Sequence, residues 1–107
     1  MTIKYIVCHH SGGSDSNPMQ DSSSFTFDQC NTLHRLRFNM ISSLGFYVGY
    51  TYYIEKSGKL YQARADEEEG AHTIGHNKDS IGICLAGNFD ATDPTPAQIA
   101  TLTALLK

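Results

Sequence analysis

Hydrophobic and polar positions follow two different periods along this chain, and the two periods separate strands from helices. Runs of β-branched and aromatic residues at 3–8, 48–55, 60–63 and 80–87 predict four strands. The run at 80–87 is almost continuously apolar, so both of its faces are expected to be covered. The Lys-Ser-Gly-Lys sequence at 56–59 predicts a turn that joins the second and third strands into a hairpin.

Two helices are predicted where apolar residues recur at steps of three and four. Each begins with a capping box, Thr26 with Gln29 and Thr95 with Gln98. Gly45 is expected to end the first helix. The residues expected to face a core are Phe27, Cys30, Leu33, Leu36, Met40, Ile41 and Leu44 in the first helix and Ile99, Leu102, Leu105 and Leu106 in the second. The residues expected toward solvent are Asn31, Arg35, Asn39 and Ser42, with His34 beside the apolar stripe at the surface.

The first strand runs directly into two histidines, His9 and His10. Open α/β sheets carry their sites at the carboxyl ends of strands, where the connecting loops leave a crevice. Neutral imidazole is the commonest protein ligand for metals. Successive strand residues point to opposite faces, so one of the two histidines, and not both, is a candidate ligand of a single metal. The residues alone leave a second interpretation open, in which both histidines are polar groups that cap the strand end.

Composition and charge narrow the classes of function. The 107 residues suffice for one domain, and 40% apolar with 18% charged residues is typical of a globular protein. A net charge of −3 gives no general attraction to nucleic acid or anionic membranes, and no run reaches the length of a transmembrane helix. The first residues do not resemble a signal peptide, which predicts a protein that is cytoplasmic as synthesised. Cys8, Cys30 and Cys84 are too few and too scattered for a disulfide framework, so they are expected to be small buried hydrophobes.

Three polar stretches remain. Residues 11–24 are rich in Ser, Gly, Asp and Asn and predict a long loop that forms one wall of the site. The acidic run at 66–69 is interpreted as a solvated face. His72 and His76 are four residues apart, but the glycines that bracket them predict a loop rather than the metal-binding face of a helix.

Five short motifs occur in an order that resembles a known family. They are Ile6-Val7-Cys8-His9-His10-Ser11, Val48-Gly49-Tyr50, Gly70-Ala71-His72, Ser80-Ile81-Gly82-Ile83 followed by Gly87-Asn88-Phe89, and Thr95-Pro96-Ala97-Gln98. Each motif is weak alone, but their order along essentially the whole chain is specific. Together they resemble the zinc-dependent N-acetylmuramoyl-L-alanine amidases, whose fold is shared by phage endolysin amidases and the peptidoglycan recognition proteins.

The resemblance implies an α/β fold in which helices flank a mixed central β-sheet, with a groove that carries Zn²⁺ across one face. Enzymes of this family cleave the amide between the lactyl group of N-acetylmuramic acid and the L-alanine of the stem peptide. His9 matches the family's first zinc ligand, and Tyr50 matches the tyrosine that orients the attacking water and the tetrahedral intermediate. His72 and Asn77 match positions that line the groove near the substrate. The implied partner is therefore a muropeptide of peptidoglycan.

The sequence departs from the family pattern in three places, one of which is Thr51, since the residue after the Gly-Tyr pair is often histidine in the family. Cys84 stands in a strand where some relatives carry a glutamate general base, which leaves proton transfer to Tyr50 or to groups that this sequence does not contain. The family's other two zinc ligands, a histidine and then a cysteine or aspartate, follow the helix that begins at Thr95, and the sequence stops at Lys107 before them. The histidines that do not match these ligand positions are His10, His72 and His76.

We therefore expect residues 1–107 to form a single amidase-like domain, of phage or prophage type, that lacks its C-terminal segment and acts on the cell wall after release. With one matched ligand, the chain is expected to bind zinc weakly and to hydrolyse peptidoglycan weakly or not at all. The alternative is a binding module that holds muropeptide without cutting it. Apolar surface that the absent segment leaves uncovered would also favour self-association.

Overall fold

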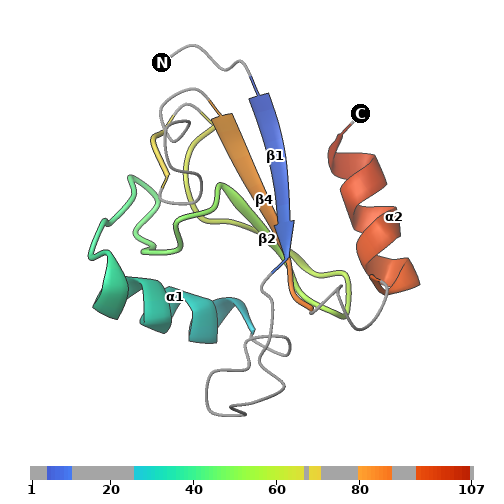
Figure 1. The fold of residues 1–107 in the computed structure, drawn as a ribbon, viewed down its shortest axis with the longest axis horizontal. Coiled ribbons are helices and arrows are strands. Elements are labelled where there is room, and N and C mark those ends of the chain that lie inside the picture. The colour runs from blue at the N-terminus through green and yellow to red at the C-terminus, as the bar shows by residue number, and fades with distance from the viewer. Residues whose placement is uncertain (1–4, 11–25, 67, 71–79, 88–93, 107) are drawn as a thin grey trace.

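The computed structural model describes residues 5–10, 26–66, 68–70, 80–87 and 94–106. The elements in chain order (Figure 1) are β1 (Tyr5–His10), α1 (Phe27–Arg37), β2 (Tyr52–Ile54), β3 (Leu60–Gln62), β4 (Ser80–Leu85) and α2 (Pro96–Leu105). All four predicted strands and both predicted helices are present. Their bounds differ from the prediction in three main ways: β1 continues through both histidines, α1 is shorter, and the strand predicted at 48–55 is confined to 52–54. The loops predicted at 11–24 and around His72 and His76 lie outside the described residues.

The four strands form one mixed sheet in the order β1-β4-β2-β3. β1 runs parallel to β4, and β4 runs parallel to β2, whereas the hairpin pairs β2 with β3 antiparallel. Because three strands are parallel, their carboxyl ends meet at the same edge of the sheet, and both strand-end histidines lie there. The predicted α/β class with a mixed central sheet is confirmed.

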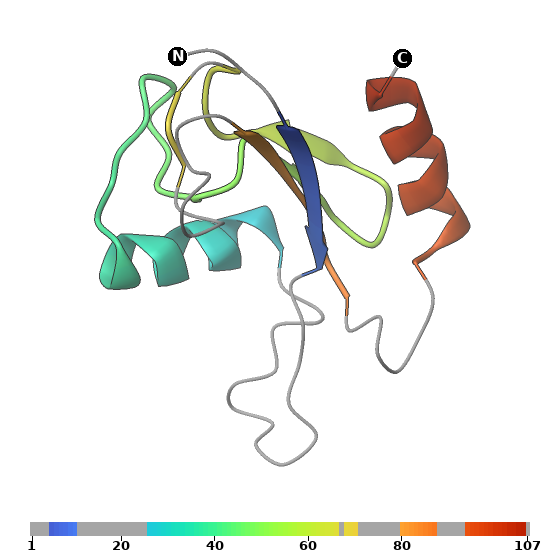
Figure 2. The ribbon, with the colours of Figure 1, turned by 45° about the horizontal axis from the view of Figure 1, so that its top comes forward.

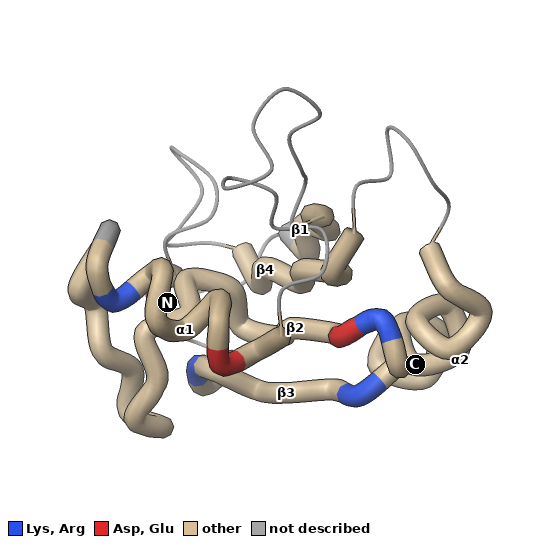
Figure 3. Tube along the Cα trace, turned by 90° about the horizontal axis from the view of Figure 1, so that it is seen from below, with Lys and Arg blue, Asp and Glu red and all other residues tan. Residues whose placement is uncertain are grey.

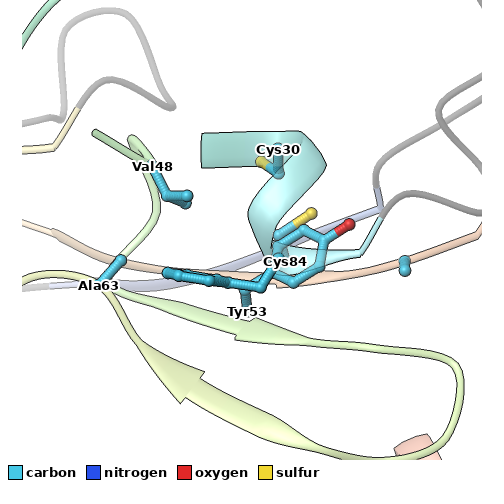
Figure 4. Close-up of a cluster of buried hydrophobic side chains, with 7 residues drawn as sticks. Cys30, Val48, Tyr53, Ala63 and Cys84 are labelled. Carbon is cyan, nitrogen blue, oxygen red and sulfur yellow. The ribbon is translucent and has the colours of Figure 1, made fainter. Parts of the chain in front are cut away.

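The two helices cover opposite faces of this sheet (Figures 1 and 2), and each face has its own core. The core on the α1 side comprises Phe27, Cys30, Val48, Tyr53, Ala63, Cys84 and Ala86. Figure 4 shows Cys30 on α1 beside Cys84 and Tyr53 of the sheet. The core on the α2 side comprises Ile54, Ile83 and Leu85, with Leu102 and Leu105 of α2 among the residues packed against it. Successive residues of β2 and β4 therefore supply alternate cores, as the pleat requires.

α1 turns a different face toward the sheet from the one that its apolar residues predict. Phe27 and Cys30 are buried as expected, but the inward face continues through polar residues: Asn31 is half-buried, and His34 is only 9% exposed. Leu36, which was expected in the core, is 73% exposed. The predicted apolar stripe is therefore wrong beyond Cys30, because hydrogen bonds made by Asn31 and His34 fix the rotation of the helix.

α1 also ends earlier than predicted. Asn39 adopts a left-handed backbone conformation, φ 53°, and its N–H donates to the carbonyl of His34 at 3.2 Å. Asparagine is the commonest substitute for glycine at such a helix stop. Gly45, φ 88°, lies in a separate turn farther along the chain.

Other apolar residues of both predicted helical stripes are expected in the core but are exposed. They are Leu33, Met40, Ile41, Leu44, Ile99 and Leu106.

α2 is attached to the sheet through Gln98. Both predicted capping boxes are formed, and in the second one Gln98 Oε1 accepts the N–H of Thr95 at 3.0 Å. Gln98 is also completely buried, and its Nε2 donates to the carbonyls of Ala86 at 2.7 Å and Ile54 at 3.3 Å. One side chain therefore caps the helix and joins it to two strand ends.

The charged turn that joins β2 and β3 packs beside α2 (Figure 3). Thr95 Oγ1 donates to the carbonyl of Lys56 at 2.8 Å, and Thr101 Oγ1 donates to the carbonyl of Gly58 at 2.6 Å. Gly58 has φ 89° and lies directly against Ala97. The hairpin predicted at 56–59 is thus confirmed, and its turn is held by the second helix.

The remaining sequence expectations have mixed outcomes. Cys30 and Cys84 are buried as predicted, but Cys8 is exposed because β1 is an edge strand of the described sheet. Where the structure describes the acidic run, it lies at the surface as predicted, with Asp66 and Glu69 exposed and Glu68 half-buried. Asp66 accepts a hydrogen bond from a tyrosine hydroxyl, and Glu68 accepts three from residues 43 and 65. Among the helices that the structure describes, none is both long and apolar enough to cross a membrane.

Candidate functional site

The candidate site lies at the carboxyl end of β1, where the two histidines face opposite sides of the sheet. In the β1–β4 register, His9 lies opposite Cys84, which belongs to the α1-side core. His10 lies opposite Leu85, which belongs to the α2-side core. The sheet therefore separates the two imidazoles, as strand alternation predicts, and they cannot share one metal ion.

Tyr50 is the aromatic residue that meets His9. The two ring centroids are 5.3 Å apart, and the ring planes are inclined by 49°. The Tyr50 ring also lies 5.6 Å from the ring of His34, and Tyr50 packs against the core cluster that contains Cys84. The structure thus brings together His9 and Tyr50, two of the four residues to which the family resemblance points. The other two, His72 and Asn77, lie outside the described residues.

Electrostatics favour the neutral form of His9. Burial lowers its pKa, and the neighbouring His10 lowers that pKa further. Neutral imidazole is the form that binds metals, so His9 is a chemically suitable zinc ligand. Burial raises the pKa of Cys84, which keeps that thiol protonated and poorly suited to metal binding. Within the described ranges, no group of three His, Cys, Asp or Glu side chains is placed to hold a metal ion.

Two side chains of α1 hold the backbone that leads into Tyr50. Asn31 Oδ1 accepts hydrogen bonds from the N–H groups of residues 47 and 48, at 2.6 and 3.2 Å. His34 Nδ1 accepts the next N–H, that of residue 49, at 2.8 Å. Because a backbone N–H can only donate, Nδ1 carries no proton, and the neutral ring holds its proton on Nε2. That nitrogen lies 3.8 Å from Cys30 Sγ.

Arg64 holds the same segment by donating a hydrogen bond to one of its backbone carbonyl groups. The residue is 2% exposed, and its Nε donates to the carbonyl of Val48 at 2.8 Å. Its other nitrogens donate to the carbonyls of Met40 and, at 3.4 Å, Glu69. Arg64, like Asn31 and His34, was not predicted as a site-forming residue. The available signal was spacing, since positions 27, 30, 31 and 34 share one helical face whatever their polarity.

A groove of about 380 Å³ opens on the opposite side of β1, next to α2. Its lining residues are Cys8, His9, His10, Leu85, Pro94, Ile99 and Leu102. His9 thus stands at a strand tip between this groove and the Tyr50 side of the sheet. The groove wall contributed by α2 is apolar, and β1 contributes the polar groups.

The chain is similar to proteins of known family and structure. Residues 1–107 match the N-acetylmuramoyl-L-alanine amidase family. The chain is 32% identical over 106 residues to peptidoglycan-recognition protein SC2 of Drosophila melanogaster, an alignment that covers 97% of this chain and 53% of the fly protein. It is 38% identical over 64 residues to the endolysin of Escherichia phage T7, which covers 55% of this chain and 42% of the endolysin.

Solved structures share the fold. The N-acetylmuramoyl-L-alanine amidase LysC from Clostridium intestinale has a TM-score of 0.74 at 31% identity, covering 97% of this chain and 60% of LysC. Bumblebee PGRP-SA has a TM-score of 0.73 at 26% identity, covering 99% of this chain and 60% of that protein. The chain therefore spans less than two thirds of the length of each of these relatives. Since the family match covers every residue and the mixed sheet agrees with it, this chain belongs to the N-acetylmuramoyl-L-alanine amidase family.

Proposed function

We propose that this chain acts on bacterial peptidoglycan as an N-acetylmuramoyl-L-alanine amidase, cleaving the amide between N-acetylmuramic acid and the L-alanine of the stem peptide. The observation that carries the proposal is the contact between His9 and Tyr50 at the tip of β1, with ring centroids 5.3 Å apart. Relatives named as endolysins, amidases and peptidoglycan recognition proteins support the same substrate class.

Tyr50 is proposed to supply the hydroxyl of the site. A phenol O–H can donate a hydrogen bond to the carbonyl oxygen that gains negative charge when the amide is attacked. His72 and Asn77 are proposed to contact the muropeptide near this point.

Zn²⁺ is proposed as the cofactor, with His9 as one ligand. When bound with an open position, zinc polarises carbonyl groups and lowers the pKa of bound water toward about 7. The described residues offer this single ligand and no group of three, whereas full zinc sites contribute roughly 10–16 kcal/mol. Titration calorimetry is therefore expected to show weak zinc binding that His9→Ala abolishes. Tight stoichiometric binding to the monomer would contradict this expectation.

The test of function compares the two adjacent histidines. Release of stem peptide from purified peptidoglycan is measured for the wild type, His9→Ala and His10→Ala. We expect weak turnover that His9→Ala abolishes and that His10→Ala preserves, because His10 faces the other side of the sheet. Turnover that survives His9→Ala would overturn the proposed role of this residue.

The second candidate function is muropeptide binding without cleavage. It is favoured by the observation that no group of three His, Cys, Asp or Glu side chains in the described part of the chain is placed to hold a metal ion. In this case no peptide is released, and calorimetry detects a muropeptide complex that remains in the presence of a chelator. The same complex would weaken in Tyr50→Ala.

Two further proposals concern the setting of the protein. The endolysin relatives support synthesis in the cytoplasm of a phage- or prophage-bearing cell, followed by action on the wall after release, which cell fractionation tests.

Self-association is supported by β1, an edge strand of the described sheet on which Ile6 is 55% exposed. Light scattering at increasing concentration is expected to show dimers, and a monomer at all concentrations would exclude them.

A further inference from the structure

We propose that Asn31 and His34 are positioning residues, which fix the backbone of residues 47–49 and thereby hold Tyr50 against His9. The inference rests on the proposed function, in which Tyr50 contacts the muropeptide. Neither side chain needs to touch the substrate. Both act through the chain segment that precedes Tyr50, and His34 also contacts the Tyr50 ring, with centroids 5.6 Å apart.

The first support is that three consecutive backbone N–H groups are bonded to side chains instead of to other backbone groups. Residues 47–49 lie outside the strands, so their N–H groups are not paired in the sheet ladder. Buried backbone donors require acceptors, and all three are bonded by side chains of one helix. The path of this segment is therefore determined by Asn31 and His34 rather than by strand pairing.

The second support is that Gly49 immediately precedes Tyr50. Glycine does not restrict its own backbone, so the direction of the following residue must be set by external contacts. On the far side of Tyr50, the N–H of Thr51 donates to the carbonyl of Gly82 at 2.8 Å. Tyr50 thus lies between one anchor on the sheet and one on α1. Removal of the α1 anchor would leave this side of Tyr50 held by the bond from Arg64 to the Val48 carbonyl. That bond lies one peptide farther from Tyr50, so the peptide between Gly49 and Tyr50 would be able to rotate.

The third support is the rigidity of the helix that carries the acceptors. Glu55 Oε2 accepts the N–H of Phe27 at 2.8 Å, which attaches the first turn of α1 to the end of β2. The Phe27 ring stacks on that of Tyr61 of β3 with centroids 4.5 Å apart. Asn31 lies about one turn and His34 about two turns farther along the same inward face, so their acceptor atoms are fixed relative to the sheet that carries His9.

The acceptor chemistry defines which substitutions preserve the contact. His34 accepts through Nδ1, and an asparagine side chain can place its amide oxygen near that position. Asn31 accepts through Oδ1, which the carboxylate of an aspartate can replace. Alanine removes the acceptor at either position. His34→Asn and Asn31→Asp are therefore conservative variants, and the two alanine variants are the disruptive ones.

A ligand-free experiment tests the geometry in the isotope-labelled full chain. We expect a scalar coupling across the hydrogen bond from the Gly49 amide to His34 Nδ1, and a nuclear Overhauser effect between the rings of His9 and Tyr50. Asn31→Ala and His34→Ala are expected to remove the ring contact, whereas Asn31→Asp and His34→Asn restore it. Phe27→Leu is the matched control, because it weakens the same helix in the core but leaves both acceptors in place. An unchanged contact between the His9 and Tyr50 rings in both alanine variants would overturn the proposal.

A double-mutant cycle then tests the functional consequence with N-acetylmuramoyl-pentapeptide as the probe. His34→Ala is expected to weaken binding about tenfold in the wild-type background and to have no further effect in Tyr50→Ala. A merely structural role would give the same loss in both backgrounds, and that outcome would overturn the proposal. If the wild type does not bind the probe, the proposed function fails, and the ligand-free spectra alone decide the positioning role.

Discussion

Burial divides the three cysteines into two chemical classes. Burial raises the pKa of Cys30 to about 12, and it also raises the pKa of Cys84 well above the ordinary value for a thiol. Since the thiolate is the nucleophile, both buried residues are expected to be inert at neutral pH. Cys8 is exposed on β1 and lines the groove beside α2.

We predict that a thiol reagent labels one cysteine in the native protein and three in denaturant. Mass mapping is expected to place the native label on Cys8, and Cys8→Ser is expected to remove it. Slow labelling of the other two should follow the rate of unfolding rather than the reagent concentration. Fast native labelling of Cys30 or Cys84 would show that the α1-side core is open.

At the scale of residues, the sequence does not reveal which polar side chains are buried and hold distant segments together. His34 and Asn31 were assigned to the surface because periodicity was counted over apolar residues alone. Their burial depends on N–H groups more than ten residues away, which no local pattern records. Gln98 was recognised as a capping residue because that contact is local, but its bonds to two strand ends are not. Local chemistry was therefore predictable, and long-range polar pairing was not.

At the scale of elements, the hairpin turn and α2 approach each other so closely that a glycine is required between them. A Cβ placed on Gly58 would lie 2.9 Å from both Cβ and the carbonyl oxygen of Ala97. The backbone φ of 89° is also unfavourable for any residue with a side chain. The hairpin itself was predictable from its sequence, whereas its contact with α2 depends on the tertiary fold.

We predict that Gly58→Ala lowers the free energy of unfolding by about 2–4 kcal/mol, the sum of a left-handed conformation and an overpacked contact. Gly45→Ala is the matched control, since its φ of 88° is almost identical but nothing lies within 4 Å of the added Cβ. It should cost only about 1–2 kcal/mol. Urea unfolding followed by circular dichroism measures both values. Equal losses in the two variants would mean that the contact with Ala97 relaxes freely.

At the scale of the whole molecule, the order of the motifs predicts the α/β class. It does not predict the hydrogen bonds that join the chain segments beside the site. The segment after α1 is held to the segment after β3 by three polar residues far apart in sequence. Arg64 donates to the Met40 carbonyl, and Ser42 Oγ donates to the Ala63 carbonyl at 2.5 Å. Glu68 accepts the N–H of Ser43 at 3.0 Å, and its other oxygen accepts the Ser43 hydroxyl. These contacts join the two segments around Arg64, whose Nε donates to the carbonyl of Val48.

The charge of Glu68 should contribute to the way the free energy of unfolding falls at acidic pH. Hydrogen bonds from Ser43, and from the backbone of Ala65, hold the pKa of Glu68 below its ordinary value of 4.5. A carboxyl group whose pKa is lower in the folded state stabilises the fold above its unfolded pKa, and this contribution disappears as pH falls through the folded pKa. Wild type should therefore be more stable than Glu68→Gln near pH 7, by less than about 1 kcal/mol because the carboxylate is largely solvated.

The same linkage requires that the advantage of wild type over Glu68→Gln shrink as pH falls below the ordinary pKa of 4.5 and be lost as pH falls through the lower pKa of the folded state. Urea unfolding of both proteins at several pH values measures the difference directly. Ser43→Ala provides an independent check, because it removes the hydroxyl donor without removing the carboxylate. It should reduce the pH dependence of stability while leaving part of it, since the backbone donors remain. A difference between wild type and Glu68→Gln that stays constant from pH 7 to pH 3 would mean that the effect of Glu68 comes from packing, and that its charge does not brace this loop.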